Sequence, residues 1–331
     1  MMPNMVGAID GENVSFAIAG AGPELRLEAV RHFKTSEFPT FTDALQRYTR
    51  EQQLSTKGLE LGLAVAGVAK GDVISQANCR WYISVSGLRA FLAAEPLILN
   101  DFAAIAWSVA SATAGRLKPI GAAMPRAVSP GRTFLVVGTG SGLGAATLVS
   151  DESGAVTVMG SEGGHCSFSP QNAREDALLA ALRKKHGHVS FERLLSASGL
   201  QSIYAWIGER DGQAVPAPEA PKIVTAALSR RDPRSVEALE IFTEILGSFA
   251  GNAVLSAGAF DGVFLVSPLL GAVLPAIQGT RFRSAFTGKG RMKKMLDPVP
   301  TSFVPDEDGP LYGTARALLS RRGSQRMALA A

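Results

Sequence analysis

The chain has few of the residues on which several protein classes depend. Its 331 residues include only two cysteines, Cys79 and Cys166, which excludes a disulfide framework and a cysteine-rich zinc site. Charged residues make up 19%, and 33 basic residues against 29 acidic ones leave a net charge of +4. That excess is too small to indicate a nucleic-acid-binding surface. No internal repeat at the spacing of solenoid proteins is present.

Leader and membrane signals are also missing. The N-terminal residues MMPNMVGAIDGENVSF have no basic start and no long apolar core, so no secretory signal is expected and the cytoplasm is the expected location. One uncharged stretch, residues 262–280, reaches the length of about 20 residues that a spanning helix needs. It contains Pro268 and Pro275 and divides into GVFLVS and LLGAVLPAI. A buried strand followed by a helix is therefore predicted, without a membrane.

The most informative stretch runs from Gly131 to Pro170. An apolar run at 133–137 is followed by a turn with four glycines, GTGSGLG at 138–144. Glycine is needed where φ is positive or where a ligand approaches the main chain, and the amides of such a turn can bind an anion. A third strand, 155–158, leads into SEGGH at 161–165, which holds a carboxylate and an imidazole. This combination indicates phosphoryl transfer to a hydroxyl compound.

The predicted elements alternate in a way that is typical of an α/β protein with two lobes. Hydrophobic residues make up 46% of the chain, enough for a sizeable core. Residues 113–130, rich in glycine and proline, are the expected boundary between the lobes. Strands are predicted at 5–9 and 14–18 (a hairpin), 25–33, 59–69, 72–75, 81–85, 97–99, 133–137, 145–149, 155–158, 264–266 and 299–304. Helices are predicted near 43–53 with Thr42 as N-cap, 86–94, 103–112, 172–186, from 190–195, from 198–199, 223–229, 235–257 and 310–319.

Two further features allow more than one interpretation. Arg281 to Lys294 carries six basic residues and no acid, which is either a solvated face or a surface for phosphate or a partner. His186 and His188 lie one residue apart near a helix end, but no third ligand accompanies them. They do not predict a metal site, and the metal ligands stay unknown.

Several motifs together resemble the bacterial glucokinase family of the hexokinase–actin ATPase fold. The resemblance covers residues 5 to about 319. The stretches that carry it are ILNDFAAIA (98–106), GTGSGLGAATLV (138–149), SEGGHCSFSP (161–170), GHVSFERLLSASGL (187–200), GSFAGNAVL (247–255), FRSAFTGKGRMK (282–293) and GPLYGTARALL (309–319). Their number and order are far more specific than a single glycine-rich turn.

The resemblance implies a fold, lobes and partners. The fold has two α/β lobes with ribonuclease H-like halves and a cleft between them. A small lobe at 1–112 is completed by the C-terminal helix at 305–320, the large lobe spans 113–304, and the tail at 321–331 is expected to be disordered. The resemblance further implies ATP and Mg²⁺ as cofactors, glucose as the sugar, and a homodimer.

Site residues follow from the same resemblance, position by position. Asp101 resembles the general base that takes the proton from the sugar 6-hydroxyl, which requires a carboxylate within hydrogen-bond reach and in line with the γ-phosphate. The residues that resemble the sugar-binding set are Asn100, Asp101, Glu162, His165 and Glu192. Carboxylates and imidazole suit a sugar because they can accept from and donate to its adjacent hydroxyl groups. The residues that resemble the second phosphate-binding loop are Gly138, Thr139, Gly140, Ser141 and Gly142.

Each of these residues also has a structural explanation. An Asn-Asp pair after a strand is often a helix cap. His165 alone is as well explained by a structural hydrogen bond, and Glu192 by the first turn of a helix. The case for a sugar site is the combination of these residues in one order.

The sequence departs from the family pattern in the first phosphate loop. The family motif Asp-x-Gly-Gly-Thr-Asn-x-Arg corresponds here to AIDGENVS at 8–15, in which only Gly11 and Asn13 match. Ala8 replaces an aspartate associated with the Mg-nucleotide, and Glu12 places a negative charge where a threonine would face phosphate. A carboxylate repels a polyphosphate unless a metal ion lies between them. Asp10 could serve the metal from two residues further on.

A second departure is Val266-Ser267-Pro268, where the family has a Gly-Gly turn near the adenosine. Pro268 removes a backbone donor and fixes φ, so a reshaped nucleotide pocket is expected. Two hypotheses follow. The chain is an ATP-dependent glucokinase, which we favour because Asp101 and the second loop are intact, or it is a sugar-binding or regulatory protein with a degraded nucleotide site. A structural or DNA-binding role has no helix-turn-helix motif to support it.

Overall fold

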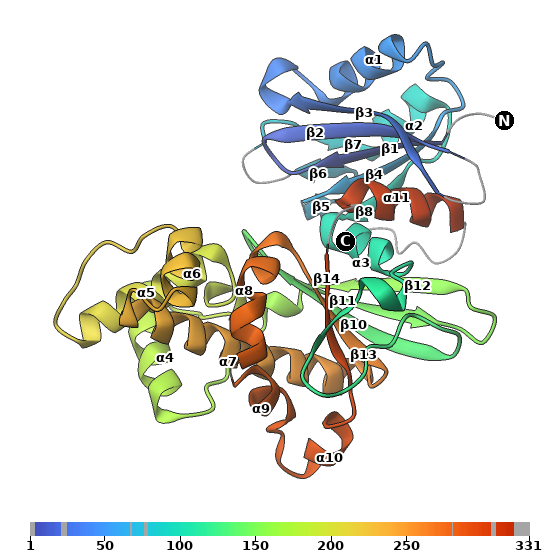
Figure 1. Ribbon diagram of the computed structural model, residues 1–331. Helices are drawn as coiled ribbons and strands as arrows, with labels where there is room; N and C mark the ends of the chain where they lie inside the picture. Colours follow the sequence, from blue (N-terminus) through green and yellow to red (C-terminus); the bar gives the residue numbers. More distant parts are fainter. Residues whose placement is uncertain are drawn as a thin grey trace. The chain divides into compact units, whose positions relative to one another are not determined.

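The computed structural model describes residues 4–20, 25–66, 68–75, 79–279, 281–305 and 309–320. These residues form two compact units, which are coloured along the chain in Figure 1. Unit 1 contains the described residues up to Ser111, Leu148–Gly160 and the C-terminal helix. Unit 2 contains Ala112–Thr147 and the residues from Ser161 to Pro305. The tail at 321–331, which we expected to be disordered, lies outside the described residues.

Unit 1 is built on a five-stranded sheet with the strand order β3-β2-β1-β4-β8. Its strands are β1 (Asn4–Ile9), β2 (Asn13–Ala19), β3 (Leu27–Lys34), β4 (Glu60–Val65) and β8 (Leu97–Asn100). A smaller sheet contains β5 (Val68–Lys70), β6 (Val73–Ser75) and β7 (Ile83–Ser84). The helices are α1 (Phe41–Glu51), α2 (Val85–Leu92), α3 (Asp101–Val109) and α11 (Gly309–Ser320). β1 and β2 form the predicted hairpin, whereas β1, β4 and β8 run parallel.

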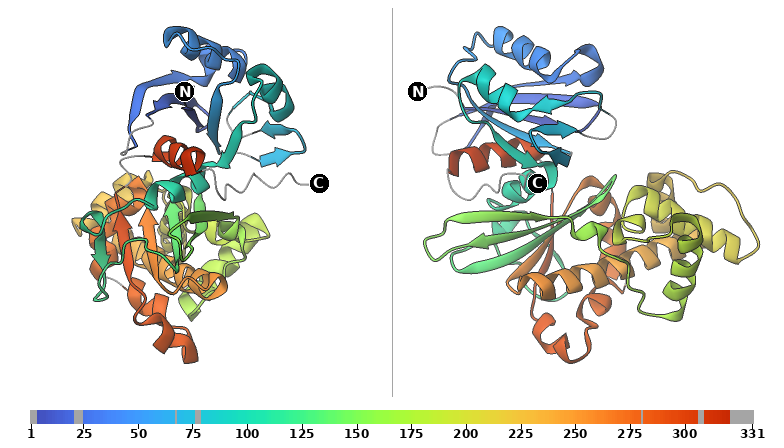
Figure 2. Two further views of the ribbon diagram at one scale, coloured as in Figure 1. Left: turned by 90° about the vertical axis from the view of Figure 1, so that its right-hand side faces the viewer. Right: turned by 180° about the vertical axis from the view of Figure 1, so that it is seen from behind.

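Helices cover both faces of this sheet, as Figures 1 and 2 show for α1 and α11. Tyr48 of α1 packs on Phe16 of β2, with ring centroids 5.3 Å apart. On the other face, Ala315 of α11 is buried in one cluster with Val6 and Ala17. Buried apolar surface contributes roughly 25 cal/mol per Å², so both helices stabilise the sheet that carries the hairpin turn.

α11 also packs closely on α3, the helix that begins at Asp101. A Cβ added at Gly313 of α11 would lie 1.7 Å from the carbonyl oxygen of Ala104 in α3. Only glycine permits this approach, because a contact that short would force the two helix backbones apart. α3 and the Asn100-Asp101 corner are thereby fixed within unit 1.

The first helix begins two residues earlier than predicted. Thr40, not Thr42, is the N-cap of α1. The Thr40 hydroxyl accepts a hydrogen bond from Asp43 N at 3.2 Å, and Asp43 Oδ2 accepts one from Thr40 N at 3.0 Å. This reciprocal capping box satisfies two amides that have no partner within the helix, which a lone N-cap threonine cannot do.

The second sheet has six strands in the order β12-β11-β10-β13-β14-β9. Its strands are β9 (Lys118–Ile120), β10 (Arg132–Thr139), β11 (Leu143–Ser150), β12 (Val156–Ser161), β13 (Gly262–Val266) and β14 (Thr301–Val304). β9 was not predicted; Pro119 lies in it, which is tolerated because β9 is an edge strand. The helices are α4 (Ala173–His186), α5 (Ala197–Arg210), α6 (Ala220–Leu228), α7 (Pro233–Ala257), α8 (Pro268–Gly279), α9 (Phe282–Thr287) and α10 (Lys293–Leu296).

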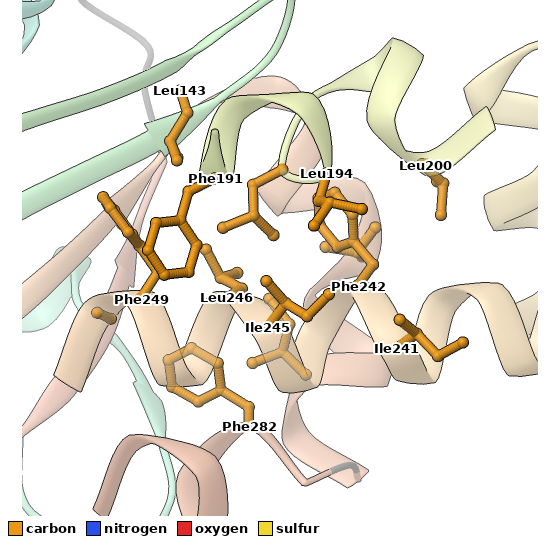
Figure 3. Packing of buried hydrophobic residues seen from close by; sticks show 14 of the residues in the cluster. Leu143, Phe191, Leu194, Leu200, Ile241, Phe242, Ile245, Leu246, Phe249 and Phe282 are labelled. Atoms are coloured by element: carbon orange, nitrogen blue, oxygen red, sulfur yellow. The ribbon is translucent and has the colours of Figure 1, made fainter. Parts of the chain in front are cut away.

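The core of unit 2 is organised around α7, along which the buried side chains of Figure 3 are arranged. Near its C-terminal end α7 presents glycine to α9. A Cβ at Gly247 would lie 2.2 Å from the Phe282 carbonyl oxygen, and one at Gly251 would lie 2.3 Å from that of Phe286. This end of α7 is therefore packed closely against α9.

Among the described residues, α7 is also the one helix that is long and apolar enough to cross a membrane, with a mean hydropathy of 1.3. The 18-residue stretch of α7 with this hydropathy is 72% buried inside the protein, so its apolar character is explained by the core. Residues 262–279 form β13 and α8, as the strand-then-helix prediction had it.

Two of the six cations in the basic segment are half-buried, whereas Arg281, Arg291, Lys293 and Lys294 are exposed. Arg283 is half-buried and donates to the carbonyl oxygens of Val299 at 3.0 Å and Asp297 at 3.1 Å. Burial lowers the pKa of this guanidinium. Lys289 donates to Ser248 Oγ at 2.9 Å. At least these two cations therefore hold α9 and its flanking turns to the rest of unit 2.

Candidate functional site

Glu162 and His165 are brought together by a tight turn at the end of β12. The backbone forms one turn of 3₁₀ helix at Gly163–His165, in which His165 N donates to Glu162 O at 2.9 Å. The turn fits because Gly164 has no side chain: a Cβ there would lie 2.2 Å from the Leu143 carbonyl oxygen. His165 Nε2 then lies 3.7 Å from Glu162 Oε2.

Glu192 reaches the same imidazole from a different segment. The predicted helix from 190–195 is only a 3₁₀ turn, Phe191–Arg193. Phe168 N donates to Val189 O at 2.9 Å and Phe191 N to Cys166 O at 3.0 Å. These bonds align the two segments, so that His165 Nδ1 lies 3.9 Å from Glu192 Oε1.

Aromatic packing holds this second segment to the core. The Phe191 ring lies 5.6 Å from that of Phe168 and 5.1 Å from that of Phe249 on α7. Figure 3 shows Phe191 directed toward α7 beside Phe249. Buried aromatic pairs of this kind contribute about 0.5–1.5 kcal/mol beyond their buried area. The segment that carries Glu192 is thereby attached to the buried core cluster of unit 2.

The three side chains form an open, polar cluster. Their exposed fractions are 80% for Glu162, 59% for His165 and 30% for Glu192. Each carboxylate lies beyond direct hydrogen-bond distance of the ring, so a ligand hydroxyl has room to bond to both partners. Acceptors on both sides of a donor–acceptor ring suit a compound with neighbouring hydroxyl groups. The structure thus brings together three of the five residues that the sequence assigned to a sugar.

The glycine-rich turn lies beside this cluster in unit 2 and is braced from two sides. Ala197 N donates to Gly140 O at 2.8 Å, and Thr139 Oγ1 donates to Leu195 O at 2.5 Å. Within the turn, Gly140 N donates to Gly142 O at 2.9 Å. From the residue that follows β13, Ser267 Oγ donates to Thr139 O at 2.5 Å. The backbone of the predicted anion-binding turn is therefore set before any ligand arrives.

Asn100 and Asp101 belong to unit 1, at the corner between β8 and α3. Asn100 Oδ1 accepts from Phe102 N at 2.9 Å and from Ala103 N at 3.3 Å. The cap that we considered as a structural explanation therefore exists. Asp101 Oδ1 accepts from Phe102 N at 2.7 Å. The positive end of the α3 dipole favours the ionised, proton-accepting form of this carboxylate.

The first hairpin turn is ordered by its own side chains. Gly11 has φ of 96°, which favours glycine. Asp10 Oδ1 accepts from Asn13 N at 2.8 Å. Thr35 Oγ1 donates to Gly11 O at 2.9 Å, and Lys34 Nζ donates to Asn13 Oδ1 at 2.7 Å. Lys34 was missed by the sequence reasoning; the pairing of Lys34 with Asn13 across β2 and β3 is what places this cation at the turn.

Ser267 is a second residue that the sequence reasoning underestimated. Its φ is 121°, a conformation that favours glycine, at the position where the family has a Gly-Gly turn. Pro268, expected to cost a backbone donor, is the first residue of α8. The N–H of that position has no partner within a helix in any case.

No group of three or more potential metal ligands occurs in the part of the chain that the structure describes. His188 Nε2 lies 3.1 Å from Ser167 Oγ, which gives this histidine a local partner. The pKa of His186 is lowered, first by burial and then by the charges of Arg193 and Lys185.

Comparison with known proteins decides the family. A sequence profile described as Glucokinase matches residues 5–321. The chain belongs to the glucokinase family. The glucokinase of Chromobacterium violaceum is 35% identical over 322 residues, which cover 96% of this chain and 89% of that protein. The bifunctional protein glk of Burkholderia thailandensis is 32% identical over 332 residues, 98% of this chain and 50% of that protein. This chain thus spans about half the length of the Burkholderia relatives that it matches.

Solved structures of glucokinases share the fold. One from an Antarctic psychrotroph has a TM-score of 0.83 at 29% identity, covering 96% of this chain and 99% of that one. A glucokinase of Balamuthia mandrillaris in complex with glucose has a TM-score of 0.76 at 22% identity, covering 97% and 94%. A ROK family glucokinase of Streptomyces griseus, in complex with glucose and AMPPNP, has a TM-score of 0.59 at 16% identity, covering 97% and 100%. The predicted hexokinase–actin ATPase fold is confirmed.

Proposed function

We propose that this member of the glucokinase family transfers the γ-phosphate of ATP to the 6-hydroxyl of glucose. The observation that carries the proposal is the convergence of Glu162, His165 and Glu192 from two segments on one exposed polar cluster. Once a sugar covers these groups, they discriminate against sugars that lack a hydroxyl, because groups of the site would then be left unpaired. The glucose complexes of the Balamuthia and Streptomyces enzymes support the choice of sugar.

Asp101 is the proposed general base, with Asn100 beside it as a further sugar ligand. The ionised carboxylate at the start of α3 can accept the proton of the 6-hydroxyl as the hydroxyl oxygen attacks phosphorus. Phosphoryl transfer requires positioning and charge stabilisation more than covalent chemistry. A base on a packed corner, held by α11 through the Gly313 contact, meets the positioning requirement.

The glycine-rich turn at 138–142 is the proposed site for the phosphates of ATP, with Gly11 and Asn13 on the first turn as further contacts. Its hydrogen-bonded backbone and its glycines, which leave the main-chain amides accessible, suit an anion. The AMPPNP in the Streptomyces structure supports ATP as the donor. On unit 1, Lys34 beside Asn13 supplies a cation.

Mg²⁺ is the cofactor that the family implies, and Asp10 is the residue that fits it. Mg²⁺ is usually held by one or two carboxylates together with substrate phosphates. A carboxylate offers about four lone-pair sites, and Asp10 uses three of them toward Asn13 N and Nδ2. One site is left for the ion, which would neutralise phosphate charge.

A sugar-binding or regulatory role is the second candidate, and the first turn is the observation that favours it. Glu12 is exposed on this turn, and Ala8 has no oxygen with which to hold a metal ion. A negative charge without a metal would repel phosphate. In that case glucose binds while ATP does not.

Replacing the proposed base tests the kinase function. Asp101→Asn keeps the side-chain shape and its oxygen acceptor but removes the basic carboxylate. We expect turnover to fall by about 10²–10⁴-fold, the usual share of general-base catalysis, while glucose affinity changes by less than about tenfold. Asp176→Asn, an exposed acid on α4, is the control and should keep full turnover. Unchanged turnover in Asp101→Asn would remove Asp101 from the mechanism.

We further propose a homodimer and a cytoplasmic location, both by analogy with the family. Light scattering after size-exclusion chromatography tests the first, since a single species of about 34.7 kDa would contradict it.

A further inference from the structure

The carboxylate of Glu192 is held by the glycine-rich turn itself. Glu192 Oε2 accepts a hydrogen bond from the backbone N–H of Leu143 at 3.0 Å. Its other oxygen, Oε1, faces His165 at 3.9 Å. One end of the turn that the sequence assigned to phosphate is therefore in contact with a residue assigned to sugar.

Gly142 makes this contact possible. A Cβ at position 142 would lie 2.7 Å from Glu192 Oε2 and 3.4 Å from the carboxyl carbon. The first distance is shorter than real Cβ contacts permit, so an alanine side chain would displace the carboxylate from the Leu143 amide. At Gly140, in the same turn, an added Cβ would meet nothing within 4 Å. The lack of a side chain is therefore required by the Glu192 carboxylate at Gly142 but by no neighbouring atom at Gly140.

The segment that carries Glu192 has one hydrogen bond within itself and two further bonds to the turn. Ser196 Oγ donates to the Glu192 carbonyl oxygen at 2.9 Å. Ala197 N donates to Gly140 O at 2.8 Å and Thr139 Oγ1 to Leu195 O at 2.5 Å. The main chain of 192–197 is fixed along the turn. If the Glu192 carboxylate is displaced, a shift of its backbone therefore cannot restore its bond to the Leu143 amide.

We infer that Gly142 and the Leu143 amide are positioning elements of the sugar site, not of the phosphate site. They hold Glu192 at the orientation in which its free oxygen faces His165 and a sugar hydroxyl. This inference rests on the proposed binding of glucose and assigns a different role to Gly142 than the sequence pattern did. It also explains why position 142 is occupied by glycine.

The test compares glycine-to-alanine variants of the full chain by calorimetry with glucose and by steady-state kinetics. Gly142→Ala should weaken glucose binding by about tenfold or more and raise the KM for glucose, while the KM for ATP changes by less than about twofold. Gly115→Ala, where an added Cβ also meets nothing within 4 Å, is the matched control and should bind glucose normally. A raised KM for ATP with unchanged glucose affinity in Gly142→Ala would overturn the inference and return Gly142 to the phosphate site.

A second measurement separates this inference from the proposed function. Thermal unfolding of Gly142→Ala is measured with Glu192 present and in a Glu192→Ala background, without any ligand. We expect the alanine at 142 to lower the midpoint by about 2–4 °C only while Glu192 is present, since a lost bond of about 1 kcal/mol has that effect in a unit of this size. Equal effects in both backgrounds would refute the contact as the cause. Failure of the unaltered protein to bind glucose would refute the proposed function. The dependence of the Gly142→Ala effect on Glu192 would then still show whether Gly142 positions the Glu192 carboxylate.

Discussion

Ser267 offers a sharp test of the structure because its backbone and its side chain act in opposite directions. With φ of 121°, it adopts a conformation that costs a residue with a side chain on the order of 1–3 kcal/mol. Its hydroxyl donates to the carbonyl oxygen of Thr139 at 2.5 Å, and such a bond contributes about 1 kcal/mol net. The serine thus connects β13 to the glycine-rich turn at the expense of local strain.

Two substitutions separate these terms. Ser267→Ala and Ser267→Gly both lose the hydrogen bond, but only glycine relieves the strain. Glycine gains about 1–3 kcal/mol in the folded state and loses about 0.4–1 kcal/mol through the greater freedom of the unfolded chain. The glycine variant should therefore be more stable than the alanine variant by about 1 kcal/mol, which reverses the usual order at positions where both residues are unstrained.

Thermal unfolding of the two variants measures this difference. In a unit of about 150–250 residues, ~1 kcal/mol corresponds to about 2–4 °C in the midpoint. Comparing glycine directly with alanine cancels the lost hydrogen bond, which both variants share. An alanine variant that melts at the same temperature as the glycine variant, or above it, would refute the strain at this position.

Two other predictions concern a buried acid and the first turn. Burial is the main cause of the raised pKa of Glu175, so the folded protein holds the proton of this carboxyl more tightly than the unfolded chain does. Stability is therefore lost as pH rises through the folded pKa of Glu175. Glu175→Gln should raise the melting midpoint at pH 7–8, by an amount that shrinks toward pH 4, and the exposed control Glu209→Gln should change the midpoint little. A gain in midpoint that does not vary with pH would contradict this link between protonation and stability. Restoring the family residues with Ala8→Asp and Glu12→Thr should raise the affinity for Mg-ATP in calorimetry. Ala8→Asn with Glu12→Thr is the uncharged control, and equal affinities in both double variants would show that the carboxylate at position 8 is not what the turn lacks.

The elements of the chain could be predicted well wherever one local rule acts alone. The DGEN turn at 10–13 predicted the hairpin of β1 and β2, and an acid in the first turn with basic residues in the last predicted the helix that became α4. The helix expected at 190–195 was wrong because Phe191 turns toward Phe168 and Phe249, and this packing favours a short turn over a helix. β9 was missed because its pairing partner, β14, lies far along the chain.

For the site, residue types were predictable but contacts were not. The order of the motifs assigned Glu162, His165 and Glu192 to one sugar-binding set. The convergence of their side chains in space depends on the hydrogen bonds between the segments at 166–168 and 189–191. The glycine-rich turn was recognised as a possible anion site from composition. Its contact with Glu192 depends on the position of a side chain that lies 49 residues beyond Leu143 in the sequence, and no local pattern in the sequence encodes that. The φ of 121° at Ser267 was likewise not predictable from the local sequence.

The central claim is that the chain binds glucose and phosphorylates it. The most direct measurement is calorimetry of the purified protein with glucose and then with Mg-ATP, followed by an assay of glucose 6-phosphate formation on the same sample. We predict that both ligands bind and that glucose 6-phosphate forms at a rate that depends on Asp101. Glucose binding without binding of Mg-ATP, and without product, would contradict the kinase function and favour a sugar-binding protein on a kinase fold.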